Sequence, residues 1–288
     1  ITEGAVTPMT YYYLGWCLAQ GGLSGVKQAF DDAIKVCPDY CFPNRLEAIL
    51  ALQCAMECNP KDARAPYYLG NLYYDKRQYD LAMKAWETSA KLDGRFPTVW
   101  RNLALAYFNK KGMVEKAIEC MEYAFELDTT DARILMELDQ LYKRVQRSHN
   151  ERLAFLQKYP ELIAQRDDLV LEEITLLNQT GAYEKAKTLL DAHIFHPWEG
   201  GEGKVPGQYQ FARVELAKQA LDAGNYRKAI AYLEECLVYP HHLGEGKLYG
   251  TQENDFYYFL GCAYDGLGES RKAKECWEQA IGGPVEPA

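Results

Sequence analysis

The sequence predicts an all-α protein made of repeated helix–turn–helix hairpins, and two spacing patterns support this fold class. A Leu-Gly-x-x-Tyr signature that starts at Leu69 returns 34 residues later at Leu103, with alanine in place of glycine. A second pattern follows each signature and places a large residue between two small ones, as in Ala82, Trp86 and Ser89. Positions three and four apart share one face of a helix, so the two patterns describe two helices that pack against each other.

Further copies of these patterns extend the repeat over most of the chain. The first signature also starts at Leu14, with Leu18 in place of the tyrosine, and at Leu260. The second pattern recurs in four more segments: Ala117, Met121, Ala124; Ala186, Leu190, His193; Ala229, Leu233, Cys236; Ala273, Trp277, Ala280. Gly181, Gly224 and Gly268 each lie five residues before the first alanine of a set, where we expect the chain to turn. One helix pair cannot bury its apolar stripe alone, so we expect about six or seven pairs to stack.

The repeats differ in regularity along the chain. Residues 38–60 hold one helix, "RLEAILALQCAMECN", without an evident partner. We expect regular repeats over residues 63–130, an irregular part over 131–168, and repeats with long connections over 169–288. In the irregular part, "NERLAFLQKYP" makes only a short second helix and "PELIAQRDD" is a connector. The long connections contain two glycine-rich loops.

These spacings resemble the tetratricopeptide repeat (TPR), a helix–turn–helix unit of about 34 residues. The resemblance covers most of the chain and implies a right-handed α-solenoid, with residues 1–288 as a single repeat domain. It also implies a concave groove, lined by the first helix of each hairpin, that binds an extended peptide or a partner helix. By this resemblance the groove-facing positions are Tyr12, Trp16, Tyr67, Asn71, Tyr74, Arg101, Phe108, Arg133, Lys143 and Arg144.

Some TPR proteins hold a chaperone's C-terminal carboxylate with lysine, asparagine and arginine side chains, and this chain resembles that clamp in part. Asn71 and Asn102 match the two asparagines. Tyr67 replaces the first lysine, Arg133 lies near the position of the second, and Glu137 or the residue before it takes the place of the arginine. The alternatives are that the aromatic residues pack between repeats and that the cations form a solvated face.

Four segments carry a second resemblance: "FHPWEGGEG", "LGEGK", "FPTVWRNLALAYFNKKG" and "ELDQLYKR". With the repeats, they resemble the C-terminal region of large bacterial proteins in which TPRs follow an uncharacterised, β-rich, carbohydrate-related region. This resemblance implies no established activity. The chain begins at Ile1 without an initiator methionine, so we expect a piece excised from a longer protein.

Composition and charge argue against several classes of function. The 288 residues are 48% hydrophobic and 25% charged, which is typical of a folded soluble domain. The formal net charge of −9 argues against nucleic acid and anionic membrane, because both need a basic surface. No apolar run approaches the roughly 20 residues that span a bilayer, and we expect no signal peptide within these residues, which leaves open one on a longer parent protein. We therefore expect a cytoplasmic protein with no nucleic-acid or membrane partner.

The nine cysteines suggest a reducing compartment, because several of them fall within apolar helical patterns. A sharper hypothesis is a zinc site of four thiolates from Cys37, Cys41, Cys54 and Cys58. Zinc knuckles normally use two-residue spacing in loops, whereas here the spacing is three residues and one pair lies on a helix. We therefore expect no metal.

The two glycine-rich loops share the sequence Gly-Glu-Gly-Lys, at residues 201–204 and 244–247. A phosphate loop of the Walker type needs another glycine five residues before the Gly-Lys pair and a Ser or Thr after it. Trp198 and His241 stand at the first of these positions, and Val205 and Leu248 at the second. We therefore expect no nucleotide.

The loops still carry the residue types of ligand sites. The candidates are His196, Trp198, Glu202, Lys204, His241, His242 and Lys247, with Glu199 and Glu245 beside them. Stacking of hairpins should place both loops on the same edge of neighbouring repeats. Catalysis needs a positioned acid–base pair in a pocket, and the sequence shows no such framework. A structural seam between hairpins is the favoured interpretation, and ligand contact is the alternative.

These observations predict a non-catalytic docking scaffold without a cofactor. Its concave face would bind a protein or peptide, or the N-terminal part of the same parent polypeptide. We expect an acidic partner segment, or one ending in a carboxylate, because Arg101, Arg133, Lys143 and Arg144 would converge on the groove. The alternative is a sugar- or phosphate-binding module, formed by the glycine-rich loops, beside a carbohydrate-active enzyme region.

Overall fold

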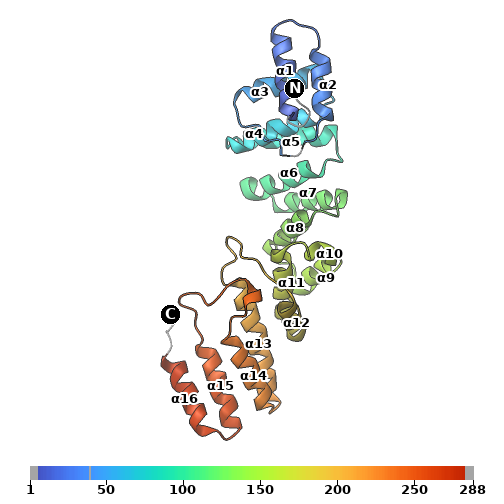
Figure 1. The fold of residues 1–288 in the computed structure, drawn as a ribbon. Coiled ribbons are helices and arrows are strands. Elements are labelled where there is room, and N and C mark those ends of the chain that lie inside the picture. Colours follow the sequence, from blue (N-terminus) through green and yellow to red (C-terminus); the bar gives the residue numbers. More distant parts are fainter. Residues whose placement is uncertain (1–5, 39, 283–288) are drawn as a thin grey trace. The chain divides into compact units, whose positions relative to one another are not determined.

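The structure, a computed structural model, describes residues 6–38 and 40–282, and all regular secondary structure in these residues is helical (Figure 1). The starting residue Ile1 lies outside the described residues. The chain divides into two compact units, Ile1–Val145 and Gln146–Ala288, and each is described by itself. The predicted all-α fold class, a solenoid of TPR-type hairpins, is confirmed.

The first unit contains eight α-helices and one π-helical turn within its described residues. They are α1 (Pro8–Gln20), α2 (Val26–Lys35), α3 (Glu47–Cys58), α4 (Arg64–Asp75), α5 (Tyr79–Leu92), α6 (Pro97–Ala106), the π-helical turn η1 (Tyr107–Lys111), α7 (Val114–Leu127) and α8 (Ala132–Arg144). The pairs α1/α2, α4/α5 and α6/α7 pack as hairpins. The unpaired α3 packs against α1 and α4, so it continues the stack without a second helix.

The second unit begins with short helices and ends with regular hairpins. Its elements are α9 (His149–Leu156), α10 (Pro160–Ile163), α11 (Asp167–Gln179), α12 (Tyr183–Ala192), α13 (Lys204–Asp222), α14 (Tyr226–Cys236), the 3-10 turn η2 (His241–Leu243), α15 (Asn254–Gly266) and α16 (Ser270–Gly282). The pairs α11/α12, α13/α14 and α15/α16 pack as hairpins. The helix α9 is short, and long connections precede α13 and α15.

The glycine of the repeat signature is needed where two helices of a hairpin touch. Gly70 on α4 lies against the indole of Trp86 on α5, and a Cβ atom at that glycine would collide with the ring. Gly15 meets the ring of Phe30 and Gly261 meets the indole of Trp277 in the same way. The two spacing patterns therefore describe one contact, in which a large residue fills the space left by a small one.

Tyr12 belongs to the core and not to the groove, which corrects the expectation from the repeat resemblance. Its side chain is fully buried, and its hydroxyl donates to Asp62 Oδ2 at 2.8 Å. The other oxygen of Asp62 accepts from the backbone N–H groups of Arg64 and Ala65, at the start of α4. Burial raises the pKa of Asp62, although these hydrogen bonds oppose the shift. The buried carboxyl thus ties α1 to α4.

A buried arginine joins three helices of the second unit. Arg213 on α13 pairs with Asp191 on α12 and with Glu235 on α14, where Nε donates to Oε2 at 2.6 Å. Its guanidinium also lies over the ring of Tyr209, 3.4 Å from the ring centroid. The two carboxylates share one guanidinium, so these contacts join the α11/α12 hairpin to the α13/α14 hairpin.

Candidate partner-binding groove and the glycine-rich loops

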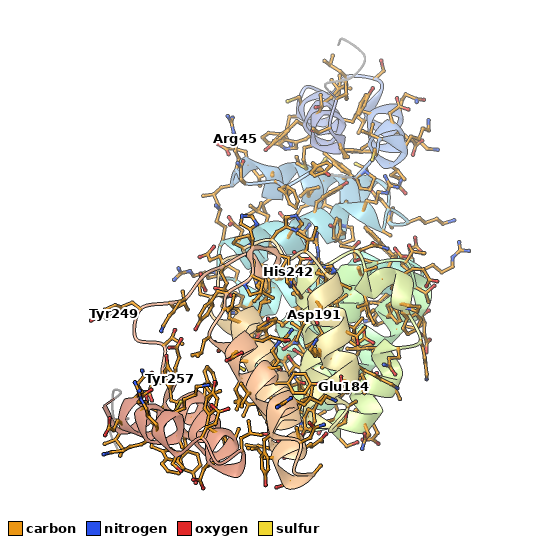
Figure 2. The ribbon with its side chains drawn as sticks, turned by 60° about the horizontal axis from the view of Figure 1, so that its bottom comes forward. Arg45, Glu184, Asp191, His242, Tyr249 and Tyr257 are labelled. Carbon is orange, nitrogen blue, oxygen red and sulfur yellow. The ribbon has the colours of Figure 1, made fainter. Side chains whose placement is uncertain are left out.

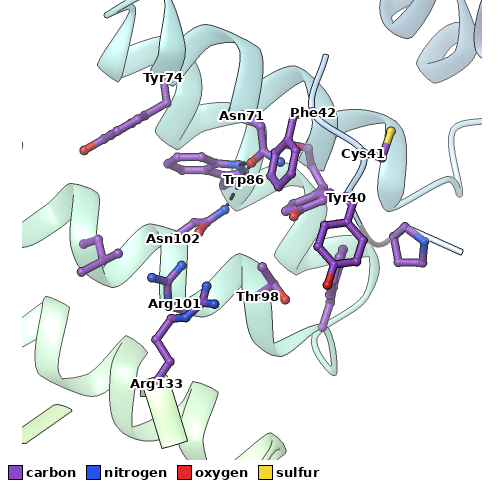
Figure 3. Close-up of a pocket in the computed structure, with 14 residues that line it drawn as sticks. Tyr40, Cys41, Phe42, Asn71, Tyr74, Trp86, Thr98, Arg101, Asn102 and Arg133 are labelled. Carbon is purple, nitrogen blue, oxygen red and sulfur yellow. Dashed lines mark hydrogen bonds between the residues drawn. The ribbon is translucent and has the colours of Figure 1, made fainter. Parts of the chain in front are cut away.

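The first unit contains an open cavity of about 520 Å³, which lies along α4 and α6 (Figure 3). Fourteen residues line it: Pro38, Tyr40, Cys41, Phe42, Tyr67, Asn71, Tyr74, Trp86, Phe96, Thr98, Arg101, Asn102, Leu105 and Arg133. The α4 residues lie four and three positions apart, so they form one face of that helix. Five of the residues predicted to bind a partner are among them: Tyr67, Asn71, Tyr74, Arg101 and Arg133.

The other three predicted partner-binding residues lie outside this cavity lining. Phe108 sits in the π-helical turn that follows α6, and its side chain is half-buried. Lys143 and Arg144 occupy the exposed last turn of α8. Of the four cations expected to converge, therefore, Arg101 and Arg133 lie at the cavity.

The two asparagines of the expected clamp are hydrogen-bonded to each other. Asn71 Oδ1 accepts from Asn102 Nδ2 at 3.2 Å and from the indole N–H of Trp86 at 3.0 Å (Figure 3). The indole also donates to the backbone carbonyl of Tyr67 at 3.2 Å. These contacts orient both carboxamides, and Asn71 Nδ2 and Asn102 Oδ1 have no hydrogen-bond partner among the described residues.

Arg101 and Arg133 differ in their electrostatic surroundings. Arg101 makes a two-point ion pair with Glu137 on α8, in which Nε donates to Oε2 at 2.6 Å and Nη2 donates to Oε1. The side chains of this pair are only 20% and 16% exposed. Arg133 is exposed, and within the described residues it has no carboxylate partner. Among the described residues, the positive charge of the cavity that lacks a carboxylate partner therefore lies at Arg133.

The sequence reasoning missed the loop side of the cavity. Tyr40 and Phe42, in the loop between α2 and α3, line the cavity beside the helical residues. The loop has no helical spacing of apolar residues, so the sequence does not predict where it lies. Its position depends on how α3 packs. The one usable signal was an alternation of aromatic residues with Cys41 and Pro43 at the point where the repeat pattern stops.

The two glycine-rich loops of the second unit hold each other. The backbone N–H of Gly203, at the start of α13, donates to Glu245 Oε2 at 2.9 Å. The backbone N–H of Phe195 donates to the carbonyl of His242 at 2.8 Å. A Cβ atom on Gly244 would lie 2.6 Å from the carbonyl oxygen of Phe195, so that close approach requires glycine. These contacts support the interpretation of the loops as a seam between hairpins.

The first loop is also fastened to α11. Asp167 Oδ1 lies 2.7 Å from His193 Nε2, and Asp167 Oδ2 lies 3.0 Å from His196 Nδ1. The backbone N–H of His196 donates to the same Oδ2 at 2.8 Å. Burial would raise the pKa of Asp167, but these hydrogen bonds outweigh it and hold that pKa below its usual value.

The remaining loop candidates differ in their surroundings. Trp198 packs its ring against Gly201. Lys247 pairs with Glu253 at 2.7 Å, and this hydrogen bond raises the pKa of the lysine. Other loop residues lie in exposed or half-buried positions: Glu202, Lys204, His241 and His242. Figure 2 shows Tyr249 projecting outward from the second loop.

A cavity of about 290 Å³ between the loops is acidic. Its lining includes Glu199, Glu202 and Glu245, together with His196 and Trp198. Three carboxylates repel a phosphate, and Glu245 already occupies the N–H group at the start of α13 that an anion would use. In the described part of the chain, no group of three or more His, Cys, Asp and Glu side chains is placed to hold a metal ion.

The cysteines proposed as zinc ligands lie in different environments. Cys41 is buried, Cys54 is half-buried, and Cys37 and Cys58 are exposed. Cys54 and Cys58 lie one turn apart on α3. Burial, and to a smaller extent the neighbouring Cys58, raises the pKa of Cys54 to about 11.

No helix in the described ranges is long and apolar enough to cross a membrane.

Comparison with protein families supports the repeat assignment. Residues 70–111 match a model described as TPR repeat, and residues 255–282 match one described as tetratricopeptide repeat. One match lies in each unit: the first runs from within α4 through α5 and α6 to the end of η1, and the second covers the α15/α16 hairpin. The two matches cover less than half of the chain, and they support TPR-type repeats at these residues.

Similar curated proteins share only a short stretch. A 75-residue stretch, 26% of this chain, is 33% identical to the human RANBP2-like and GRIP domain-containing protein 8 and covers 4% of it. A stretch of the same length is 32% identical to the human E3 SUMO-protein ligase RanBP2 and covers 2% of it. The chain thus matches a small fraction of the length of either protein.

Solved structures with a similar fold cover much more of the chain. The structure of Naa15/Naa10 bound to HypK-THB has a TM-score of 0.55 and 12% identity over 95% of this chain and 36% of that one. A tetratricopeptide repeat protein from Parabacteroides merdae has a TM-score of 0.44 and 14% identity over 97% of this chain and 94% of that one. The first of these likenesses, at 12% identity, shows the fold alone.

Proposed function

We propose that this chain is a non-catalytic docking scaffold and that the cavity along α4 and α6 binds an extended acidic segment of a partner protein. The observation that carries the proposal is the contrast between the two cations at the cavity. Arg101 is neutralised by Glu137, whereas Arg133 is exposed without a carboxylate partner among the described residues. An unpaired cation favours an anionic segment and rejects a cationic one.

The asparagine pair supports an extended backbone at the same place. Asn71 Nδ2 can donate to a peptide carbonyl, and Asn102 Oδ1 can accept from a peptide N–H. Their orientation is fixed by the indole of Trp86 before any partner arrives. A preorganised pair loses little conformational entropy on binding, which favours recognition of a main chain.

The alternative of a sugar- or phosphate-binding module draws no support from the loops. The carboxylates of Glu199, Glu202 and Glu245 disfavour a phosphate, and one face of the Trp198 ring is covered by Gly201. The bacterial parent polypeptide and the cytoplasmic location stay predictions from the sequence. The N-terminal part of that parent is one bait to test beside unrelated acidic segments.

The experiment measures peptide binding by the full chain and two matched variants. Fluorescein-labelled 12-residue peptides on a Gly/Ser background, with zero to four Asp residues, are titrated in fluorescence polarisation at several salt concentrations. We expect affinity to rise with Asp content. Arg133→Ala should weaken binding of the acidic peptides several-fold and flatten the salt dependence, because exposed charges are screened over about 8–10 Å.

Arg144→Ala is the control, because Arg144 is an exposed arginine on the same helix outside the cavity lining. It should leave affinity and salt slope unchanged. Equal losses in the two variants would show that general positive charge, and not the cavity, attracts the peptide. No binding of any acidic peptide by the unsubstituted chain would remove the proposal.

A further inference from the structure

The loop between α2 and α3 presents two aromatic rings to solvent. Residues 40–43 alternate in burial: Tyr40 is 92% exposed and Phe42 is 74% exposed, whereas Cys41 and Pro43 are buried. Cys41 and Pro43 therefore anchor the segment in the fold, and the two aromatic rings that alternate with them face solvent.

The two rings lie on the cavity. Tyr40 and Phe42 both line it, on the side away from Arg101 and Arg133 (Figure 3). Tyr67 and Phe96 line it as well, and their ring centroids are 4.7 Å apart. Within the described residues, no aromatic ring packs against Tyr40 or Phe42. The cavity thus has a packed aromatic wall and a second aromatic wall without a ring partner.

The exposure of this second wall needs an explanation. Large aromatic side chains usually lose most of their exposure on folding, because each buries a large apolar area. Tyr40 also holds φ at 57°, a left-handed conformation that is uncommon for a bulky residue. Residues kept in such conformations concentrate at sites that clamp a ligand.

We propose that Tyr40 and Phe42 form one side of an apolar slot that receives a single large apolar side chain of the docked segment. The packed pair Tyr67 and Phe96, which lines the same cavity, would form the other side. A carboxylate of the same segment pairs with Arg133. The proposal rests on the proposed function and names the chemistry of its partner: an acidic segment with one aromatic or branched aliphatic anchor.

Charge and apolar area together select this partner. A purely acidic segment would leave both exposed rings in water, whereas an apolar anchor buries them and gains the hydrophobic contribution. A basic segment with the same anchor would be repelled by the positive charge of Arg133. Binding of an aromatic anchor between aromatic walls also has the geometry of interface hot spots, which lie in desolvated pockets.

The first test compares two synthetic peptides on the unsubstituted full chain. Each is a fluorescein-labelled 12-residue peptide on a Gly/Ser background with an Asp-Asp pair and one Phe, at spacings of one to five residues. In the matched peptide, alanine replaces the Phe. We expect the best Phe peptide to bind about tenfold more tightly or better, which is the loss typical of a hot-spot residue. Equal affinities at every spacing would overturn the slot.

The second test uses variants of the full chain. Tyr40→Ala/Phe42→Ala should reduce the affinity for the Phe peptide to that for the Ala peptide and leave the Ala peptide unaffected. Both rings are exposed, so circular dichroism and thermal unfolding should match the unsubstituted chain. Tyr249→Ala removes another exposed tyrosine, from the second unit, and should change neither affinity.

The outcomes separate the slot from the acidic docking site. If Arg133→Ala weakens both peptides and the double variant weakens neither, the slot is wrong and the docking site stands. If the double variant weakens only the Phe peptide and Arg133→Ala has no effect, the acidic partner is wrong. If neither peptide binds, both proposals fall.

Discussion

Glu137 on α8 accepts two hydrogen bonds from the guanidinium of Arg101 on α6, one of them from Nε to Oε2 at 2.6 Å. The helix α6 is the first helix of the α6/α7 hairpin, and α8 follows that hairpin in the chain. The pair is largely shielded from water, with side-chain exposures of 20% and 16%. The ion pair therefore joins α6 to α8, and it neutralises the charge of Arg101 that a partner could otherwise use.

This pair predicts different roles for two arginines of one cavity. Arg101→Ala leaves the shielded carboxylate of Glu137 without its partner, so we expect a loss of about 1–3 kcal/mol in the free energy of unfolding. Arg133→Ala should stay within about 0.5 kcal/mol, because Arg133 is exposed. Urea unfolding followed by circular dichroism measures both.

Arg101→Ala/Glu137→Ala completes a double-mutant cycle. The double variant should lose less than the sum of the single losses, because removing both charges leaves none unpaired. Additive losses would mean that the ion pair contributes nothing of its own and that Arg101 acts through packing.

The tryptophan at the centre of the α4/α5 contact predicts a graded series. Trp86 is 3% exposed and donates to Asn71 and Tyr67, so Trp86→Ala should cost about 3–5 kcal/mol. Trp277→Ala should cost less, because that ring is half-buried in the last hairpin. Tyr74→Ala should cost about 1 kcal/mol, since its ring packs 5.4 Å from that of Trp86. Equal losses in denaturant melts would contradict the assignment of helix faces.

The hairpins were predictable from the sequence because their contacts are local. Gly70 and Trp86 lie on consecutive helices joined by a short turn, so a fixed spacing brings them together in every regular copy. The same holds for Gly261 and Trp277 in the last hairpin. Where the spacing held, the sequence pattern predicted both the helices and the residues between them.

The cavity was predictable only in part, because it depends on contacts between hairpins. Arg101 and Arg133 were both expected at the groove, but which of them meets Glu137 depends on how α6 and α8 pack. Tyr12 fits the same pattern position as the groove residues, yet it is buried against Phe30 on α2, Tyr68 on α4 and the carboxyl of Asp62. The loop that contains Tyr40 lacks a helical period, so the spacing rules of the repeat did not apply to it.

The seam between the glycine-rich loops predicts that two similar glycines differ in tolerance. Gly244 has φ of 78° and a carbonyl where a Cβ atom would go, so Gly244→Ala should cost more than about 1 kcal/mol. Gly246 has neither constraint, so Gly246→Ala should stay within about 0.5 kcal/mol. Thermal unfolding of the two variants decides this. A similar small loss in both would show that the loops do not depend on their contact through Phe195.

The carboxylate that fastens the first loop predicts a loss of stability in acid. The pKa of Asp167 is lowered in the folded state because the hydrogen bonds of His193 and His196 outweigh its burial. A lowered carboxylate pKa contributes stability above the unfolded value, about 3.9, and loses it as the pH falls through the folded value. Asp191 behaves in the same direction, since Lys187 and Arg213 outweigh its burial and lower its pKa.

Comparison of the unsubstituted chain with Asp167→Asn tests this over pH 7 to pH 3. At pH 7 the variant should be about 1–2 kcal/mol less stable, because it lacks a charged hydrogen-bond acceptor. The difference should shrink below about pH 4, where the carboxylate itself becomes protonated. Asp222→Asn, at an exposed carboxylate that ends α13, is the control and should track the unsubstituted chain at every pH. A constant difference between Asp167→Asn and the unsubstituted chain down to pH 3 would mean that the loop is held by packing and not by this charge.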